Sequence, residues 1–251
     1  MTDKTIDVSI VIPSYNESAT LKTESLAAID AYLKKQDYSY EVLVVDDKST
    51  NNTLAAVREA INNKKHFQLL ENAHGGKAVT VMTGMIKSRG KVAVFTDIDQ
   101  ATPIDQLDKL LPKFAEGFDI VIGTRSSRAG APLERKLMSW GFATLRNITL
   151  GLPFKDTQCG FKGFNRQSIE DIFPFMLKKW QSTKKTGAAV NAGFDIETLF
   201  LAKKKGFKIA EVPVQWHHVQ NEKQVQVIQD SLEAVRDMIR IRMTDLSGKY
   251  S

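Results

Sequence analysis

The sequence predicts an α/β protein built on a mostly parallel sheet that is flanked by helices. Two observations carry this prediction. Short, apolar, β-branched runs alternate with longer segments of helical character along the first half of the 251-residue chain, and such alternation favours parallel pairing of the strands. The runs also end in polar loops, and ligands bind parallel sheets at the carboxyl ends of the strands.

The elements follow a regular order up to about residue 124. Each apolar run is short enough for a buried strand and is followed by a longer segment that favours a helix. Pro103 opens a further helix, since proline suits the first helical turn. We expect strands at 8–12, 41–45, 67–70, 92–96 and 119–123, and helices at about 17–35, 52–62 and 78–88.

The second half of the chain is less regular. We expect an apolar segment at 137–150, a helix at 197–205, a strand at 208–214 and a final amphipathic helix at about 225–242. No internal repeat, low-complexity tract or long linker divides the sequence. We therefore expect residues 1–251 to form a single domain that ends in the amphipathic helix.

The charge balance favours anionic partners. The chain has 35 Lys and Arg against 29 Asp and Glu, a formal net charge of +6, which suits phosphates, acidic lipids or nucleic acid. The aromatic residues lie in apolar runs instead of along a basic stripe, which argues against nucleic acid. A single cysteine, Cys159, excludes an internal disulfide. Without a signal peptide or an apolar stretch of about 18 residues, we expect a cytoplasmic protein with peripheral membrane contact at most.

An acidic pair follows the predicted strand at 92–96. Asp97 and Asp99 are separated only by Ile98, so both carboxylates can turn toward one hard cation. Mg²⁺ or Mn²⁺ bridging a diphosphate is the natural ligand of such a pair. The alternative is a solvated turn, because short motifs of this kind are common.

A second acidic pair and a glycine-rich turn follow two other strands. Asp46 and Asp47 come directly after the strand at 41–45, where a carboxylate can bind a base N–H or a ribose hydroxyl, or else cap the next helix. Residues 74–77, His-Gly-Gly-Lys, open a helix. Free N–H groups and a lysine there suit a phosphate, although an ordinary turn is the alternative. The Rossmann and Walker A glycine patterns are both absent from the sequence.

Six motifs occur in the order found in the family 2 inverting glycosyltransferases. The sequence resembles most closely the branch that includes dolichyl-phosphate glucosyl- and mannosyltransferases, and the resemblance spans about residues 8–218. The motifs are Val-Ile-Pro-Ser-Tyr-Asn-Glu (11–17), Val-Val-Asp-Asp-Lys-Ser-Thr (44–50), His-Gly-Gly-Lys (74–77), Asp-Ile-Asp-Gln (97–100), Gly-Thr-Arg (123–125) and Asp-Thr-Gln-Cys-Gly-Phe-Lys (156–162).

The resemblance implies a GT-A fold and a metal-dependent transfer of a hexose with inversion. It implies a nucleotide-sugar donor, UDP-glucose or GDP-mannose, a divalent metal ion, and a polyprenyl (dolichyl-type) phosphate acceptor. It also implies contact with a membrane surface and leaves room for a membrane-anchoring partner protein. Two alternatives stay open within the family, namely mannose transfer from GDP-mannose and transfer to a hydroxyl group of a glycan.

The same resemblance assigns roles to individual residues. Asp97, Asp99 and Gln100 hold the metal and diphosphate, and Asp99, Asp156, Arg125 and Arg135 are the implied catalytic group. The acceptor phosphate is assigned to Arg125, Arg135 and Ser139. Arg128 joins this group because it lies with Arg125 and Arg135 in one glycine-containing loop. The residues assigned to binding of the donor are Pro13, Tyr15, Glu17, Asp46, Asp47, Lys77, Asp97 and Gln100. The chain departs from the family pattern at Lys48, Asn51, Ala78 and Met82.

Two segments could meet a membrane. Residues 137–148 carry apolar side chains bracketed by Arg135, Lys136 and Arg146, a pattern that suits either the bilayer interface or the core. In the final helix we expect the face with Val235 and Ile239 to pack on the core, and the alternative is the membrane, where the family uses a terminal amphipathic helix. His217 and His218 receive no role, and we do not expect Cys159 to act as a nucleophile because no histidine base stands beside it.

Overall fold

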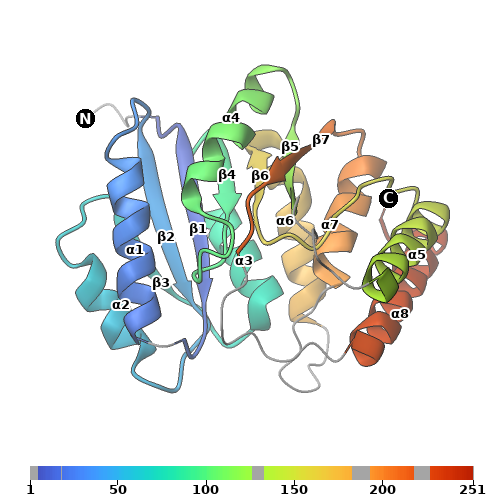
Figure 1. Ribbon diagram of the computed structural model, residues 1–251, viewed down its shortest axis with the longest axis horizontal. Helices are drawn as coiled ribbons and strands as arrows, with labels where there is room; N and C mark the ends of the chain where they lie inside the picture. The colour runs from blue at the N-terminus through green and yellow to red at the C-terminus, as the bar shows by residue number, and fades with distance from the viewer. Residues whose placement is uncertain (1–4, 18, 126–132, 183–192, 218–226, 251) are drawn as a thin grey trace.

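The computed structural model describes residues 5–17, 19–125, 133–182, 193–217 and 227–250, without the side chains of 19–22, 133–139 and 227–232. Within these residues the strands form one seven-stranded sheet in the order β3-β2-β1-β4-β6-β5-β7 (Figure 1). Only β6 runs against its neighbours. The mostly parallel α/β architecture predicted from the sequence is confirmed.

The strands lie close to their predicted positions. Their carboxyl ends extend one or two residues further than the apolar runs in several cases, so that Ser14, Asp46 and Arg125 belong to strands. The bounds are β1 Val8–Ser14, β2 Tyr40–Asp46, β3 Phe67–Glu71, β4 Val92–Phe95, β5 Ile120–Arg125, β6 Lys162–Asn165 and β7 Ile209–Val214.

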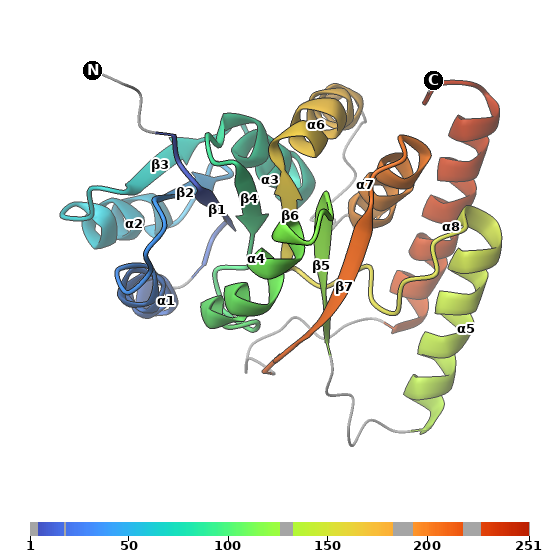
Figure 2. The ribbon, with the colours of Figure 1, turned by 90° about the horizontal axis from the view of Figure 1, so that it is seen from above.

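The helices connect these strands on both sides of the sheet (Figure 2). A short 3-10 helix, η1 Ile104–Gln106, follows Pro103 and leads into the helix expected there. The helices are α1 Ala19–Leu33, α2 Thr53–Ile61, α3 Gly76–Lys87, α4 Leu107–Ala115, α5 Leu133–Leu150, α6 Arg166–Gln181, α7 Gly193–Lys204 and α8 Val227–Leu246.

Strand β6 and helix α6 have no counterpart in the sequence-based prediction. Strand β6 has the sequence Lys-Gly-Phe-Asn, which is neither an apolar run nor a regular alternation. Its backbone pairs with β4 and β5 on both sides, so both sets of ladder hydrogen bonds are satisfied and the strand is stable despite its composition.

Two apolar layers cover the two faces of the sheet. Alternate residues of β1, such as Val11 and Ile12, belong to different layers, because successive side chains of a strand point to opposite faces. One layer is closed by α1, α2 and α4, and the other by α3, α6, α7 and α8. This packing fixes the strand ends, from which the polar loops emerge.

Helix α8 packs through a face that differs from the predicted one. Ala234, Met238 and Ile241 are buried, whereas Ile239 is 57% exposed. The prediction placed Ile239 on the core face and is wrong at that residue. None of the described helices is long and apolar enough to cross a membrane.

Candidate active site

The loops after β1 and β2 are tied to each other. Asn16 has a left-handed backbone (φ 49°), and its side chain accepts the Thr50 N–H at 2.8 Å. Its own N–H donates to Ser49 Oγ at 3.0 Å. Both loops therefore lie side by side at the carboxyl edge, as expected for neighbouring parallel strands.

Asp47 fixes the turn at the start of α3. The side chain is 2% exposed, and its two oxygens accept the N–H groups of Gly75 at 2.6 Å and Gly76 at 2.7 Å. The His74 ring lies 3.0 Å from the same carboxylate. The interpretation of these N–H groups as a free phosphate cradle is therefore wrong, because Asp47 already occupies them.

Asp46 stabilises the loop in which it lies. Its oxygens accept the Ser49 N–H at 2.8 Å and the Ser49 hydroxyl at 2.6 Å, and only 1% of the residue is exposed. The N-cap position of α2 is Asn52, and the preceding Asn51 accepts the Thr53 N–H at 3.0 Å. The alternative interpretation of this pair, in which Asp46 or Asp47 caps α2, is therefore wrong.

The acidic pair after β4 is arranged differently. Asp97 Oδ1 lies 2.6 Å from the Lys77 Nζ at the start of α3, and a third of each side chain is exposed. Asp97 Oδ2 lies against Gly160, where a Cβ atom would come within 2.0 Å of it. Only glycine allows this close approach, so the loop before β6 and the loop after β4 are adjacent.

Asp99 and Gln100 complete the loop after β4. Asp99 Oδ1 accepts the Ala101 N–H at 3.0 Å, a contact that holds the carboxylate in place. Gln100 has a left-handed backbone (φ 53°), and its Oε1 is buried without a hydrogen-bond partner. An unpartnered buried oxygen is costly, and it is the kind of atom that a bound cation would satisfy.

A small polar pocket lies where these segments meet. The loop after β4 contributes part of its wall, and residues from the ends of β5 and β7 and from the loop before β6 form the rest. It is lined by Asp97, Asp99, Ala101, Thr102, Arg125, Gln158, Gly160 and Trp216. The loops after β1, β2 and β3 do not line this pocket.

Arg125 and Asp156 form a two-point ion pair. Arg125 Nε lies 2.6 Å from Asp156 Oδ2, and one terminal nitrogen lies 2.9 Å from Oδ1. The guanidinium also lies over the Trp216 ring, 5.9 Å from its centroid. Burial raises the pKa of the Asp156 carboxyl, but the hydrogen bonds and charge of Arg125 outweigh it, so the pKa lies below its ordinary value.

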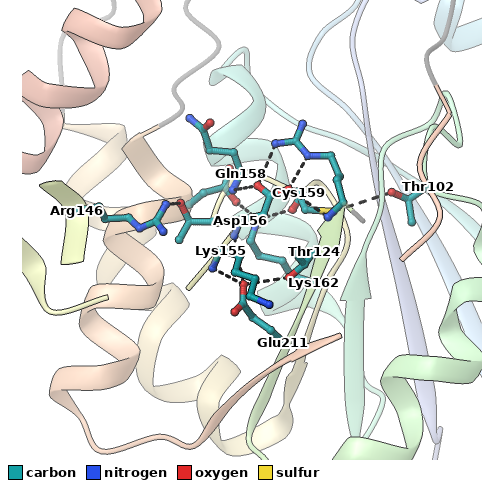
Figure 3. A network of polar contacts seen from close by, with 12 residues as sticks. Thr102, Thr124, Arg146, Lys155, Asp156, Gln158, Cys159, Lys162 and Glu211 are labelled. Atoms are coloured by element: carbon teal, nitrogen blue, oxygen red, sulfur yellow. Dashed lines mark hydrogen bonds and ion pairs between the residues drawn. The ribbon is translucent and has the colours of Figure 1, made fainter. Parts of the chain in front are cut away.

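Two further residues hold the Asp156 loop (Figure 3). Glu211 of β7 accepts the Lys155 N–H at 2.7 Å and the Thr124 hydroxyl at 3.0 Å. Arg146 of α5 is 2% exposed and donates to Thr157 Oγ1 at 3.0 Å. Arg146 is thus a buried anchor, and of the two interpretations left open for this segment, a charge at the bilayer interface does not apply to Arg146.

A buried ion pair lies behind the acidic pair. Lys162 Nζ contacts Asp195 Oδ1 and the Cys159 carbonyl oxygen, each at 2.5 Å. Burial raises the pKa of Asp195, and the charges of Lys162 and Lys77 offset this only in part. The sequence analysis singled out neither side chain, because they lie 33 positions apart and only the fold brings them together.

Trp216 and Gln158 are pocket residues that the sequence analysis did not assign. Trp216 follows the predicted strand at 208–214, so the rule that ligands bind at strand ends could have identified it. The neighbouring His217 donates its backbone N–H to the Ala101 carbonyl at 2.8 Å, which holds the two loops together. His218 lies outside the described residues.

The remaining residues predicted for the site belong to two segments, one at the end of β1 and one that follows β5. Pro13 belongs to β1, and Glu17 accepts the Thr53 hydroxyl through its carbonyl oxygen. The exposed Tyr15 ring lies 5.0 Å from the His74 ring. Arg128 lies outside the described residues, as do the side chains of Arg135 and Ser139 in α5. Cys159 is buried, which raises the pKa of its thiol.

The residues present fit a divalent cation that the substrate helps to bind. Among the described residues no group of three or more His, Cys, Asp or Glu side chains could hold a metal. Asp97 and Asp99 with the unpartnered Gln100 Oε1 nevertheless offer hard oxygen ligands. Mg²⁺ sites commonly use one or two carboxylates together with substrate phosphates and water.

The chain is similar to named glycosyltransferases along nearly its whole length. It is 32% identical to a dolichyl-phosphate beta-glucosyltransferase of Saccharomyces cerevisiae, over 99% of this chain and 78% of the relative. It is 28% identical to the human protein of that name, over 98% of this chain and 78% of the relative.

Solved structures share the fold. Glucosyl-3-phosphoglycerate synthase from Mycobacterium tuberculosis in complex with UDP has a TM-score of 0.66 at 17% identity, covering 94% of this chain and 80% of that one. Mannosyltransferase PcManGT from Pyrobaculum calidifontis in complex with GDP-Man and Mn²⁺ has a TM-score of 0.62 at 21% identity, covering 95% and 65%.

The family assignment agrees with the geometry of the strand ends. Residues 9–173 match the family described as Glycosyl transferase family 2, and this range includes the acidic pair, Arg125 and the Asp156 loop. A pocket lined by two carboxylates and a guanidinium, in a chain so similar to enzymes of this family, leads to one conclusion. The chain is a glycosyltransferase and belongs to glycosyl transferase family 2.

Proposed function

We propose that this enzyme transfers glucose from UDP-glucose to a polyprenyl phosphate of the dolichyl type, with inversion at the sugar. The observation that carries the proposal is the polar pocket that Asp97, Asp99 and Arg125 line together. Such a pocket can hold a metal-bound diphosphate on one side and an anionic acceptor on the other. The names of the relatives at 28–32% identity support the glucose donor and the dolichyl phosphate acceptor.

The metal proposed for this site is Mg²⁺ or Mn²⁺, held by Asp97 and Asp99 with Gln100 beside them. Solved neighbours in complexes that contain Mn²⁺ or Mg²⁺ together with UDP support this choice. A bound divalent ion would supply stabilisation of the negative charge that grows on the departing diphosphate. Asp99 holds its position through the Ala101 N–H, so this residue keeps the carboxylate oriented before the donor binds.

The nucleoside would lie along the ends of β1 and β2. Pro13, Tyr15 and Glu17 border this region, with the Tyr15 and His74 rings in contact. We propose that Asp46 and Asp47 serve the nucleoside mainly by shaping the loops, because their oxygens are already engaged with Ser49, Gly75 and Gly76. Lys77 would contact the diphosphate from the start of α3.

Arg125 would bind the acceptor phosphate, together with Arg128, Arg135 and Ser139 of the following segment. A phosphate monoester is mostly ionised near neutral pH, so the attacking oxygen needs no general base. Asp156 suits this acceptor, since its lowered pKa and its contacts with Arg125 make it a poor base. We propose that Asp156 positions Arg125, while Arg135 joins the catalytic group.

The proposed acceptor is a lipid, so we propose peripheral association with the cytoplasmic side of a membrane. The outward faces of the neighbouring helices α5 and α8 support this (Figure 2). Trp140 and Ile148 of α5 are 67% and 78% exposed, and Met243 of α8 is 61% exposed. Exposed apolar patches of this kind mark interaction sites. A membrane-anchoring partner protein is compatible with the same surface, and we propose that residues 1–251 act as one domain.

Transfer of labelled sugar tests the proposal. Purified protein is incubated with Mn²⁺, polyprenyl phosphate and either UDP-glucose or GDP-mannose, and label is followed into the organic phase. We expect label to move with UDP-glucose and to be lost in Asp99→Asn, while Lys91→Met, which alters an ion pair far from the site, behaves like wild type. Label transfer with GDP-mannose but not with UDP-glucose would show that the donor is GDP-mannose. Turnover of the sugar nucleotide without labelling of the lipid would show that the acceptor is a hydroxyl group and not the lipid phosphate.

The membrane surface has its own test. Replacing Ile148 and Met243 by serine removes exposed apolar area without touching the core, at about 1 kcal/mol of lost transfer energy for each side chain. We expect weaker co-sedimentation with anionic vesicles, while turnover of a short, water-soluble polyprenyl phosphate stays unchanged. Unchanged sedimentation would exclude these helices as the contact surface.

A further inference from the structure

The ion pair between Lys77 and Asp97 occupies part of the proposed metal site. Lys77 Nζ lies 2.6 Å from Asp97 Oδ1, on a carboxylate to which the divalent cation would bind. The pair joins the first turn of α3 to the loop after β4. An ammonium group and a metal ion therefore share one carboxylate, and they carry charge of the same sign.

Lys77 contributes a positive charge to this site, because a lysine ammonium is protonated at neutral pH. The carboxylate that it pairs with is Asp97, one of the two carboxylates of the proposed metal site. Asp195, the buried carboxylate described above, is paired with Lys162 at 2.5 Å. The cation of Lys77 is thus held directly on a proposed metal ligand.

The charge of Lys77 opposes metal binding to the free enzyme. It neutralises part of the attraction that Asp97 offers, and it repels a divalent cation over a distance of a few ångströms, where charge interactions are strong. A nucleotide diphosphate reverses this balance, because its negative oxygens attract the metal and give Lys77 a second partner. The same lysine therefore weakens metal binding without the nucleotide and supports the complex once the nucleotide is present.

We propose that Lys77 is a built-in counter-ion of Asp97 that keeps metal affinity low until the nucleotide diphosphate arrives, so that metal and donor bind together. This inference rests on the proposed function, which places the metal at Asp97 and Asp99. Lys77 acts as a positioning residue here, through its effect on Asp97. The opposite role is that Lys77 merely orients Asp97 for the metal, in which case its loss would weaken metal binding.

Binding of Mn²⁺ alone separates these two roles. Free and bound Mn²⁺ are measured by electron paramagnetic resonance for wild type, Lys77→Met and Lys77→Gln, with and without UDP. We expect both variants to bind Mn²⁺ alone about tenfold more tightly than wild type. UDP should increase the Mn²⁺ affinity of the variants less than that of wild type. Its oxygens still attract the metal in the variants, but there is no Lys77 charge left for them to neutralise. Circular dichroism melts show that the variants are folded.

Matched controls connect the effect to the charge at this position. Lys77→Arg retains the cation and should return Mn²⁺ affinity toward the wild-type value. Lys91→Met removes another lysine–aspartate pair, at 2.7 Å from Asp7, near the amino ends of β1 and β4. It should leave Mn²⁺ binding unchanged, because this pair lies at the opposite edge of the sheet from Asp97.

The outcomes distinguish this inference from the proposed function. Equal or weaker Mn²⁺ binding in both neutral Lys77 variants would overturn the inference and leave the metal site standing. Wild-type protein that fails to bind Mn²⁺ in the presence of UDP, or an Asp97→Asn variant that binds it like wild type, would overturn the metal site and the inference with it.

Discussion

Two acidic pairs at the same edge of the sheet have opposite environments. Asp46 and Asp47 after β2 are 1% and 2% exposed, and they accept hydrogen bonds from the neighbouring loops. Asp97 and Asp99 after β4 line the pocket, and Asp97 shares an ion pair that is a third exposed. In sequence the two pairs look alike, since each directly follows an apolar strand.

The difference follows from what each pair meets in space. The N–H groups at the start of α3 point at Asp47 and consume its acceptor capacity, which leaves a rigid loop. The loop after β4 meets Gly160, whose missing side chain leaves room beside Asp97. The carboxylates of the first pair satisfy backbone donors and build the framework, whereas those of the second pair line a polar pocket.

The largest expected effect is on catalysis, at the second pair. Asp99→Asn preserves the acceptor for the Ala101 N–H but removes the charge that would bind a cation. We expect transfer to fall by about a thousandfold, with stability changed by about 1 kcal/mol or less. Labelled-sugar transfer and urea unfolding measure the two quantities. A large loss of stability would show that both pairs belong to the framework.

The first pair should show the reverse pattern. Asp47→Ala leaves the N–H groups of Gly75 and Gly76 without their acceptor. We expect the free energy of unfolding to fall by about 2–4 kcal/mol. Activity per folded molecule should fall much less than in Asp99→Asn. Urea unfolding, with active-site titration of the folded fraction, checks this result, and unchanged stability would contradict it.

Asp156 extends the comparison to a carboxylate whose partner is a guanidinium. Its pKa in the folded state lies below the ordinary value of 3.8, so the ionised carboxylate stabilises the fold above about pH 4, and this contribution is lost as the pH falls through the lower value. Asp156→Asn should lower the free energy of unfolding by about 2–3 kcal/mol at pH 7. Below pH 4 the free energies of unfolding of the variant and of wild type should approach each other. A difference in free energy that stays constant with pH would exclude the ion pair as its cause.

Gly160 provides the mildest test of the second pair. A methyl group at Gly160→Ala would lie 2.0 Å from Asp97 Oδ2 and would force that carboxylate aside. We expect the Mn²⁺ concentration for half-maximal transfer to rise by about tenfold, an effect of about 1.4 kcal/mol. Gly141→Ala, where a Cβ meets nothing within 4 Å, controls for the loss of a glycine. Identical metal dependence in the two variants would show that Asp97 does not hold the metal.

The prediction succeeded wherever a local pattern decides the structure. Apolar runs fixed the positions of β1 to β5 and β7, because a buried strand needs continuous apolar side chains. Strand β6 escaped prediction, since Lys162 and Asn165 are polar and the strand is held by backbone pairing on both sides. The outward direction of Ile239 also escaped, because apolar spacing along a helix does not reveal which face meets the core.

The sequence by itself determined the order of the strands other than β6, the loops that carry carboxylates and the family to which the chain belongs. Only the tertiary structure decided the role of each carboxylate. It paired Asp156 with Arg125, buried Asp46 and Asp47 among backbone donors, and placed Asp97 between Lys77 and Gly160. The physical reason is that the energy of a charge depends on the groups packed around it, and those groups come from distant parts of the chain.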